Sequence, residues 1–157
     1  MSLLKFKFDG NLDYQQRAIE SVVGLFEGQP LANETYSVSI GTQEGGSQLS
    51  LGDDEFSNIA AVANQLVLTD ELLLENLQKI QEENNIPRQS ELAGRHFSVE
   101  MENGTGKTYV YLRTIFELNK RYGFTKFIVV VPSIAIREGV QKSLEVMREH
   151  FKELYDQ

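Results

Sequence analysis

The sequence contains no cysteine, which excludes a disulfide framework and any metal site built from thiolates. Its two histidines, His96 and His150, lie far apart along the chain and form no local metal-binding pattern. A chain without cysteine suits a reducing compartment, and we expect the protein to be cytoplasmic.

Long apolar stretches are also missing. The longest run, Phe127 to Val131, ends at Pro132 and is far shorter than the roughly 20 residues that cross a bilayer. The N-terminus has no long apolar stretch followed by a small-residue cleavage site. We therefore expect neither a membrane anchor nor export.

The chain has no excess of basic residues. It carries 15 Lys and Arg against 23 Asp and Glu, which gives a formal net charge of -8. Such a charge, if spread evenly, would repel a phosphate backbone, so any DNA contact must be local or made by other parts. With 41% hydrophobic and 24% charged residues, the 157 residues have the composition of one soluble globular domain.

Apolar residues recur at spacings of three and four in several segments, which predicts amphipathic helices. Thr69 offers a capping side chain at the start of one helix, while Gly28 and Gly123 are placed to end two others. The predicted helices cover 14–27, 53–66, 70–84, 109–122 and 134–155.

Alternation of polar and apolar residues predicts strands at 5–8 and 95–101, and a short strand or hairpin at 36–40. The β-branched run at 127–131 predicts a parallel strand covered on both faces. Strand, loop, helix, strand and helix in this order form a βαβ unit, so the predicted fold class is α/β. His96 is expected to lie beneath the predicted sheet.

A glycine-rich segment lies between the predicted strand at 95–101 and the next helix. Backbone N–H groups at a helix N-terminus, together with one cation, can hold a polyphosphate. Gly104 and Gly106 allow positive φ and close approach to phosphate oxygens. Lys107 is placed to reach the β and γ phosphates, and the Thr108 hydroxyl to ligate Mg²⁺. The nucleotide-binding candidates here are Glu102, Asn103, Gly104, Thr105, Gly106, Lys107 and Thr108.

The segments 101–114 and 131–140 resemble the restriction subunit of type III restriction-modification enzymes, which are superfamily two helicase-like motors joined to a nuclease. The match is close over 97–140, and Met101, which departs from the generic phosphate-loop pattern, fits this family. The resemblance implies a partial RecA-like P-loop NTPase domain, with a parallel sheet flanked by helices, that binds ATP and Mg²⁺. It also places Ser133 and Arg137 at a motif that touches the DNA backbone.

Residues 12–19 resemble the glutamine motif that reads adenine in such motors, which implies that Gln15 hydrogen-bonds the base. Read without the resemblance, Gln15 is an exposed polar residue in the first turn of an amphipathic helix. Arg137 likewise has an alternative role, as a solvated helix residue paired with Glu138 or Gln141. The resulting organisation is a glutamine-motif helix at 13–28, an insertion of loops and helices at 30–95, and the βαβ segment at 96–157.

Hydrolysis in such motors needs an aspartate and a glutamate at the end of an apolar strand, and no such strand follows Pro132. The cluster at 53–55 precedes the phosphate loop and is better explained as acidic residues at a helix N-terminus. We therefore expect a segment that binds ATP but neither hydrolyses it nor translocates or cuts DNA by itself.

For the complete protein, the resemblance implies an ATP-dependent site-specific deoxyribonuclease with a helicase-like ATPase. DNA and a modification (methyltransferase) subunit are its expected partners. Two alternatives stay open, namely another superfamily two DNA helicase without a nuclease and a regulatory nucleotide-binding module.

Overall fold

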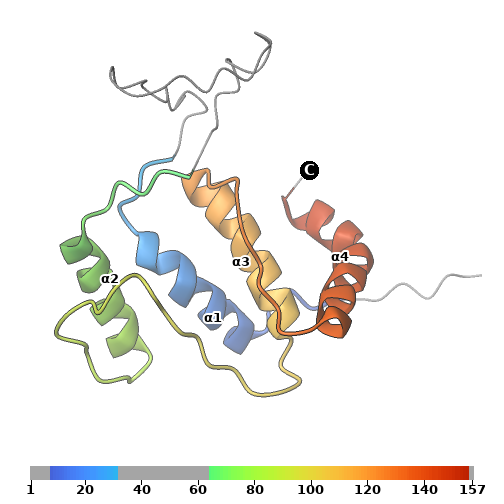
Figure 1. Cartoon of the computed structure of the whole chain (residues 1–157), viewed down its shortest axis with the longest axis horizontal. Coiled ribbons are helices and arrows are strands. Elements are labelled where there is room, and N and C mark those ends of the chain that lie inside the picture. The colour runs from blue at the N-terminus through green and yellow to red at the C-terminus, as the bar shows by residue number, and fades with distance from the viewer. Residues whose placement is uncertain (1–7, 32–63, 156–157) are drawn as a thin grey trace, which may run out of the picture.

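The structure is a computed structural model, and it describes residues 8–31 and 64–155. In Figure 1, α1 lies between α2 and α3, and α4 lies on the other side of α3. The elements are α1 (Asp13–Val23), the 3₁₀ turn η1 (Gly24–Phe26), α2 (Asp70–Glu83), α3 (Lys107–Tyr122) and α4 (Ile134–Tyr155). Among the helices of the described residues, none is long and apolar enough to cross a membrane.

The first predicted helix is confirmed, with its last turn tightened into η1. It starts where the N–H groups of Gln15 and Gln16 reach back to the carbonyl of Leu12, at 2.9 and 3.0 Å. It is followed by Gly28, whose φ of 90° few other residues adopt. The glycine therefore turns the chain away from the helix axis, as its position in the sequence predicts.

The core between α1 and α3 is built from the apolar stripe of each helix. Ile19 and Val23 of α1 are fully buried, and Val110 and Leu118 of α3 pack against them. Phe124, which follows α3, completes this cluster. The amphipathic pattern that predicts both helices thus also identifies the faces that meet.

Helix α2 is confirmed, and the side chain of Thr69 caps it by accepting from the N–H of Leu72 at 3.4 Å. It packs against η1, and its Leu73 is almost completely buried. Beside this contact, the buried amide of Asn76 donates to the carbonyls of Leu25 and Glu27, at 3.1 and 2.9 Å. These bonds satisfy two carbonyls that η1 leaves without helical partners.

Helix α4 packs on α3 through a ladder of aromatic rings. Tyr109 stacks on Phe151 at 5.6 Å, Phe116 stacks on Phe151 at 4.9 Å, and Phe116 stacks on Tyr155 at 5.1 Å between ring centroids. Because residue numbers rise together on both helices, α4 runs in the same direction as α3. Only its second half joins this ladder, and Ile134 in the first turn is exposed.

None of the described residues forms a β-strand, so the predicted parallel sheet is unconfirmed. Segments 95–101 and 127–131 run without regular secondary structure, because a strand exists only when a neighbouring strand shares its ladder of hydrogen bonds. Ile128 and Val130 are 92% and 87% exposed, so the apolar run predicted to be covered on both faces is uncovered here. His96 is exposed as well, and its expected position beneath a sheet is wrong.

Four further predictions fall on other parts of the chain. The predicted helix at 53–66 lies mostly outside the described residues, and its last residues, 64–66, are not helical. The predicted strands at 5–8 and 36–40 also lie outside them, apart from Phe8. The boundaries of the predicted insertion at 30–95 stay a prediction.

Candidate nucleotide site

The glycine-rich loop leads directly into α3. Gly104 and Gly106 have φ of 80° and 84°, in the left-handed region that glycine tolerates. Gly106 is the residue before the first helical position, and no side chain caps the helix there. Uncapped N–H groups and the positive end of the helix dipole favour an anion at this point.

Within the loop, side chains fold back on the backbone. The Thr105 hydroxyl donates to the carbonyl of Glu102 at 2.7 Å. The ammonium group of Lys107 donates to the same carbonyl at 2.7 Å and to Oδ1 of Asn103 at 3.3 Å. These acceptors are neutral, so a phosphate oxygen would be the stronger partner for Lys107.

Gln15 lies against this loop from α1. It is 6% exposed, and its side-chain amide donates to the carbonyl of Thr105 at 2.9 Å. A Cβ added to Gly106 would lie 2.6 Å from Nε2 of Gln15, which shows how closely the two segments approach. Gln15 is therefore not the exposed polar residue of the alternative interpretation, and the structure joins the glutamine motif to the phosphate loop. Its contact with adenine stays a prediction.

The loop also forms one end of an open groove between α1, α2 and the segment 86–105. Asn103, Gly104 and Thr105 line the groove at the loop, and Tyr14 and Arg17 line it from α1. Tyr14 is 48% exposed, so an aromatic face is available beside the loop for a planar ligand.

The described residues contain no group of three His, Asp or Glu that could hold a metal ion. Thr108, in the first turn of α3, is half-buried and offers a hydroxyl oxygen, the kind of ligand that Mg²⁺ accepts. A Cβ added at Gly104 would meet no atom within 4 Å, so the space beside this glycine is open. The residues present thus fit Mg²⁺ that is held mainly by nucleotide phosphates.

Ser133 and Arg137 lie at the start of α4, away from the contacts described above. The Ser133 hydroxyl accepts from the N–H of Ile136 at 3.3 Å and so caps the helix. Arg137 is exposed, and among the described residues it forms no ion pair, including none with Glu138. No hydrogen bond of the described residues joins either residue to the phosphate loop, so their role at DNA stays a prediction.

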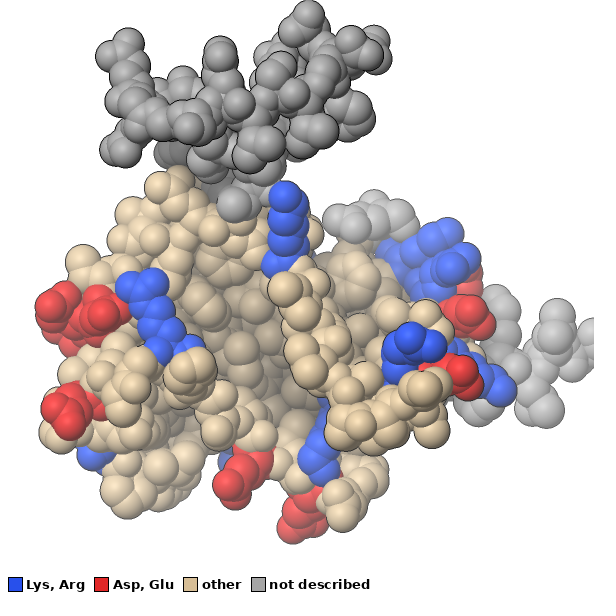
Figure 2. Space-filling model, viewed as in Figure 1, with Lys and Arg blue, Asp and Glu red and all other residues tan. Residues whose placement is uncertain are grey.

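Charge on the face shown in Figure 2 is mixed, with Lys and Arg interspersed among Asp and Glu. A continuous basic surface, which nonspecific binding to duplex DNA would require, is not present on this face.

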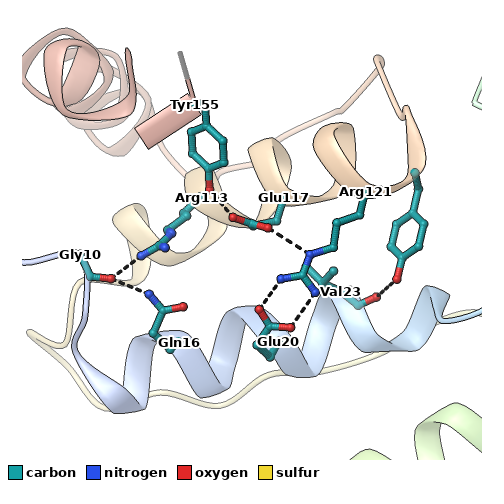
Figure 3. A network of polar contacts seen from close by, with 9 residues as sticks. Gly10, Gln16, Glu20, Val23, Arg113, Glu117, Arg121 and Tyr155 are labelled. Carbon is teal, nitrogen blue, oxygen red and sulfur yellow. Dashed lines mark hydrogen bonds and ion pairs between the residues drawn. The ribbon is translucent and has the colours of Figure 1, made fainter. Parts of the chain in front are cut away.

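Polar contacts missed by the sequence analysis link α1, α3 and α4 (Figure 3). Arg113 donates to the carbonyl of Gly10, to which the Gln16 amide also donates. Arg121 pairs with Glu20 and Glu117. The signal available in the sequence was the i,i+4 spacing of Tyr109, Arg113, Glu117 and Arg121 along one side of a predicted helix.

One polar contact of α3 involves a histidine. The Tyr109 hydroxyl lies 3.0 Å from Nε2 of His150, and Arg113 donates to the same hydroxyl at 3.3 Å. Burial, followed by the positive charge of Arg113, lowers the pKa of His150 below its ordinary value. The imidazole is therefore neutral at physiological pH.

Comparison with known proteins gives a consistent set of relatives. Residues 11–156 match the family model described as "Type III restriction enzyme, res subunit". The chain is 32% identical over 156 residues to the Res subunit of the type III restriction-modification enzyme EcoPI from Escherichia phage P1, covering 96% of this chain and 14% of that protein. It is 29% identical over 156 residues to the EcoP15I Res subunit from Escherichia coli, covering 96% of this chain and again 14% of that protein.

A third relative matches a shorter segment. The StyLTI Res subunit from Salmonella typhimurium is 46% identical over 63 residues, which are 39% of this chain and 6% of that protein.

Proposed function

This chain belongs to the type III restriction enzyme Res subunit family, and from that premise we propose that its phosphate loop binds Mg·ATP for a helicase-like, DNA-dependent ATPase. The chain spans 14% of the length of the first two relatives, so the activity of the complete protein is part of the proposal. That protein acts on DNA as a site-specific endonuclease together with a modification methyltransferase subunit, and it works in the cytoplasm.

One observation carries the proposal: two left-handed glycines precede an uncapped helix, with Lys107 poised over the turn. The loop N–H groups contact the phosphates, and Lys107 exchanges its neutral partners for the β and γ phosphate oxygens. The Thr108 hydroxyl ligates Mg²⁺. None of these groups activates water, so this segment binds ATP without hydrolysing it.

Gln15 serves the adenine end of the same nucleotide. Its amide N–H is already engaged with the carbonyl of Thr105, which leaves the side-chain carbonyl oxygen as an acceptor. That oxygen can accept from the exocyclic amine of adenine, whereas guanine presents another acceptor at the corresponding position. Gln15 thereby selects ATP over GTP while it holds the loop.

The test is calorimetric titration of Mg·ATP and Mg·ADP into the parent chain and into Lys107→Ala. We expect the substitution to weaken both affinities by about tenfold or more, because a charge-assisted contact contributes roughly 1.5–3 kcal/mol. Lys126→Ala is the matched control, because Lys126 is exposed and only its backbone groups bond to Asn64. Equal affinity of the parent and Lys107→Ala would refute the role of Lys107.

Two further ligands separate the base from the phosphates. Inorganic tripolyphosphate reports on the loop alone, and the ratio of ATP to GTP affinity reports on Gln15. We expect the parent to prefer ATP over GTP by at least about tenfold, because an unpaired acceptor in a buried contact is costly. Equal affinity for ATP and GTP would overturn adenine recognition while leaving the phosphate site in place.

A further inference from the structure

Two side chains of α4 contact Tyr109 in the first turn of α3. Tyr109 follows Thr108 directly, is 7% exposed, and stacks its ring on Phe151 with an interplanar angle of 18°. Its hydroxyl reaches Nε2 of His150 at 3.0 Å. The residue next to the proposed Mg²⁺ ligand is therefore held by both packing and a polar contact.

Arg113, one turn further along α3, closes the same cluster. Its guanidinium donates to the Tyr109 hydroxyl at 3.3 Å and to the carbonyl of Gly10. A Cβ at Gly10 would lie 3.3 Å from the Tyr109 hydroxyl and 3.6 Å from Cε1 of His150. The segment before α1, the start of α3 and the end of α4 thus meet at close range around one hydroxyl group.

The cluster combines stacked rings with hydrogen bonds. The Tyr109 hydroxyl oxygen accepts a hydrogen bond from Arg113, and Nε2 of neutral His150 can accept a hydrogen bond from the same hydroxyl. The groups that face His150 are Tyr109 and Arg113 from α3, the ring of Phe8, and Glu153 on its own helix. This arrangement fixes both the distance and the orientation of the two helices, which stacking alone leaves freer.

We infer that the contact between Tyr109 and His150 is a joint that transmits occupancy of the phosphate loop to α4. The inference rests on the proposed nucleotide site. Lys107, Thr108 and Tyr109 belong to one helical turn, so a shift of the first two toward phosphate displaces the third. Close packing does not absorb such a shift, and the second half of α4 moves with Tyr109.

Helix α4 is continuous from Ile134 to Tyr155, so the displacement reaches its first turn, where Ser133 and Arg137 lie. Between Ile134 and His150 the helix spans about 24 Å at its ordinary rise per residue. Tyr109 and His150 are thus positioning residues that touch neither nucleotide nor metal. They connect the phosphate loop with the helix that carries both DNA-contact candidates.

The first test follows the imidazole signals of the parent chain by NMR during titration with Mg·ATP. The chain has only two histidines, and His96→Gln assigns them. We expect the His150 signals to move as the nucleotide site fills. If Mg·ATP binds and the His150 signals stay unchanged, the inferred coupling through Tyr109 and His150 is refuted while the proposed function stands. Absence of any Mg·ATP binding by calorimetry would overturn both.

The second test removes one hydroxyl group. In Tyr109→Phe we expect the His150 response to be lost and Mg·ATP affinity to fall about threefold to tenfold, as for one lost hydrogen bond. Tyr122→Phe is the matched control. Tyr122 lies at the other end of α3, and its hydroxyl donates to the carbonyl of Val23 in α1. The control should keep both the response and the affinity, and equal effects of the two substitutions would overturn the inference.

A conservative replacement distinguishes positioning from packing. His150→Gln keeps a side-chain group that can bond to the Tyr109 hydroxyl, whereas His150→Phe keeps only an aromatic ring. We expect the parent affinity for Mg·ATP within about twofold in His150→Gln and a threefold or greater loss in His150→Phe. The opposite order would show that the ring alone matters and would overturn the inference.

Discussion

The side-chain amide of Gln15 donates to the carbonyl of Thr105 at 2.9 Å, so a residue in the first turn of α1 holds the middle of the phosphate loop. The two residues are 90 positions apart in the chain. Gln15 is buried where it meets the loop, so we expect the two segments to act as one unit. A change at either partner is therefore expected to affect the other.

Gly106→Ala tests this unit. The substitution places a Cβ 2.6 Å from Nε2 of Gln15 at a φ of 84°, so it creates both a clash and backbone strain. We expect Mg·ATP affinity to fall by more than about tenfold. Gly104→Ala is the control, since its φ of 80° is strained too but its Cβ meets nothing within 4 Å. An equal loss in both variants, measured by calorimetry, would assign the effect to backbone strain alone.

The helices were the part of the fold that the sequence could predict. Capping and periodicity are local signals, and they placed α4 at 134–155 and the end of α3 at Gly123, as the structure has them. The strands were not confirmed, because a strand depends on partners elsewhere and the β-branched run at 127–131 has none among the described residues. Local sequence therefore predicts these helices, while the sheet stays unconfirmed.

The candidate site shows the same division. The spacing of Gly104, Gly106 and Lys107 predicts a phosphate loop before a helix, and the structure confirms the helix and the left-handed glycines, while phosphate binding stays a prediction. Spacing could not show that Gln15 bonds to Thr105, nor that His150 meets Tyr109. Both contacts join residues distant in the chain, so they follow from packing and not from any local pattern.

Asn76→Leu is expected to lower the free energy of unfolding by about 1–3 kcal/mol. The substitution removes both donors to the carbonyls of Leu25 and Glu27 in the contact between α2 and η1. Urea denaturation followed by circular dichroism measures the loss. Gln78→Leu on the same helix is the control, because its bond to the carbonyl of Gln89 is exposed and should cost less than about 0.5 kcal/mol. Similar losses in both variants would contradict the role of Asn76.

Stability should fall as the pH drops below the ordinary histidine pKa. Burial lowers the pKa of His150 from 6.5 in the folded chain, so the unfolded chain binds more protons once the pH falls below about 6.5. The contribution of neutral His150 is thus present above that pH and is lost as the pH falls through the folded-state pKa. Urea denaturation between about pH 7.5 and pH 5 measures this slope. His150→Gln should reduce the slope, and an unchanged slope in this variant would contradict the assignment to His150.

Ile128→Lys combined with Val130→Lys is expected to suppress self-association of this chain without loss of stability. Both side chains are almost fully exposed in a β-branched segment without regular secondary structure, the kind of segment that can pair with other chains. Sedimentation velocity over a range of concentrations measures association. Equal association of the parent and the double variant would show that this segment is not the site of self-association. Phe127→Lys is the contrasting control, because Phe127 packs against the core and its replacement should destabilise the chain. If the predicted parallel sheet forms in a longer polypeptide, the same two lysines become buried there and destabilise it, so opposite effects in the two settings would support the sheet.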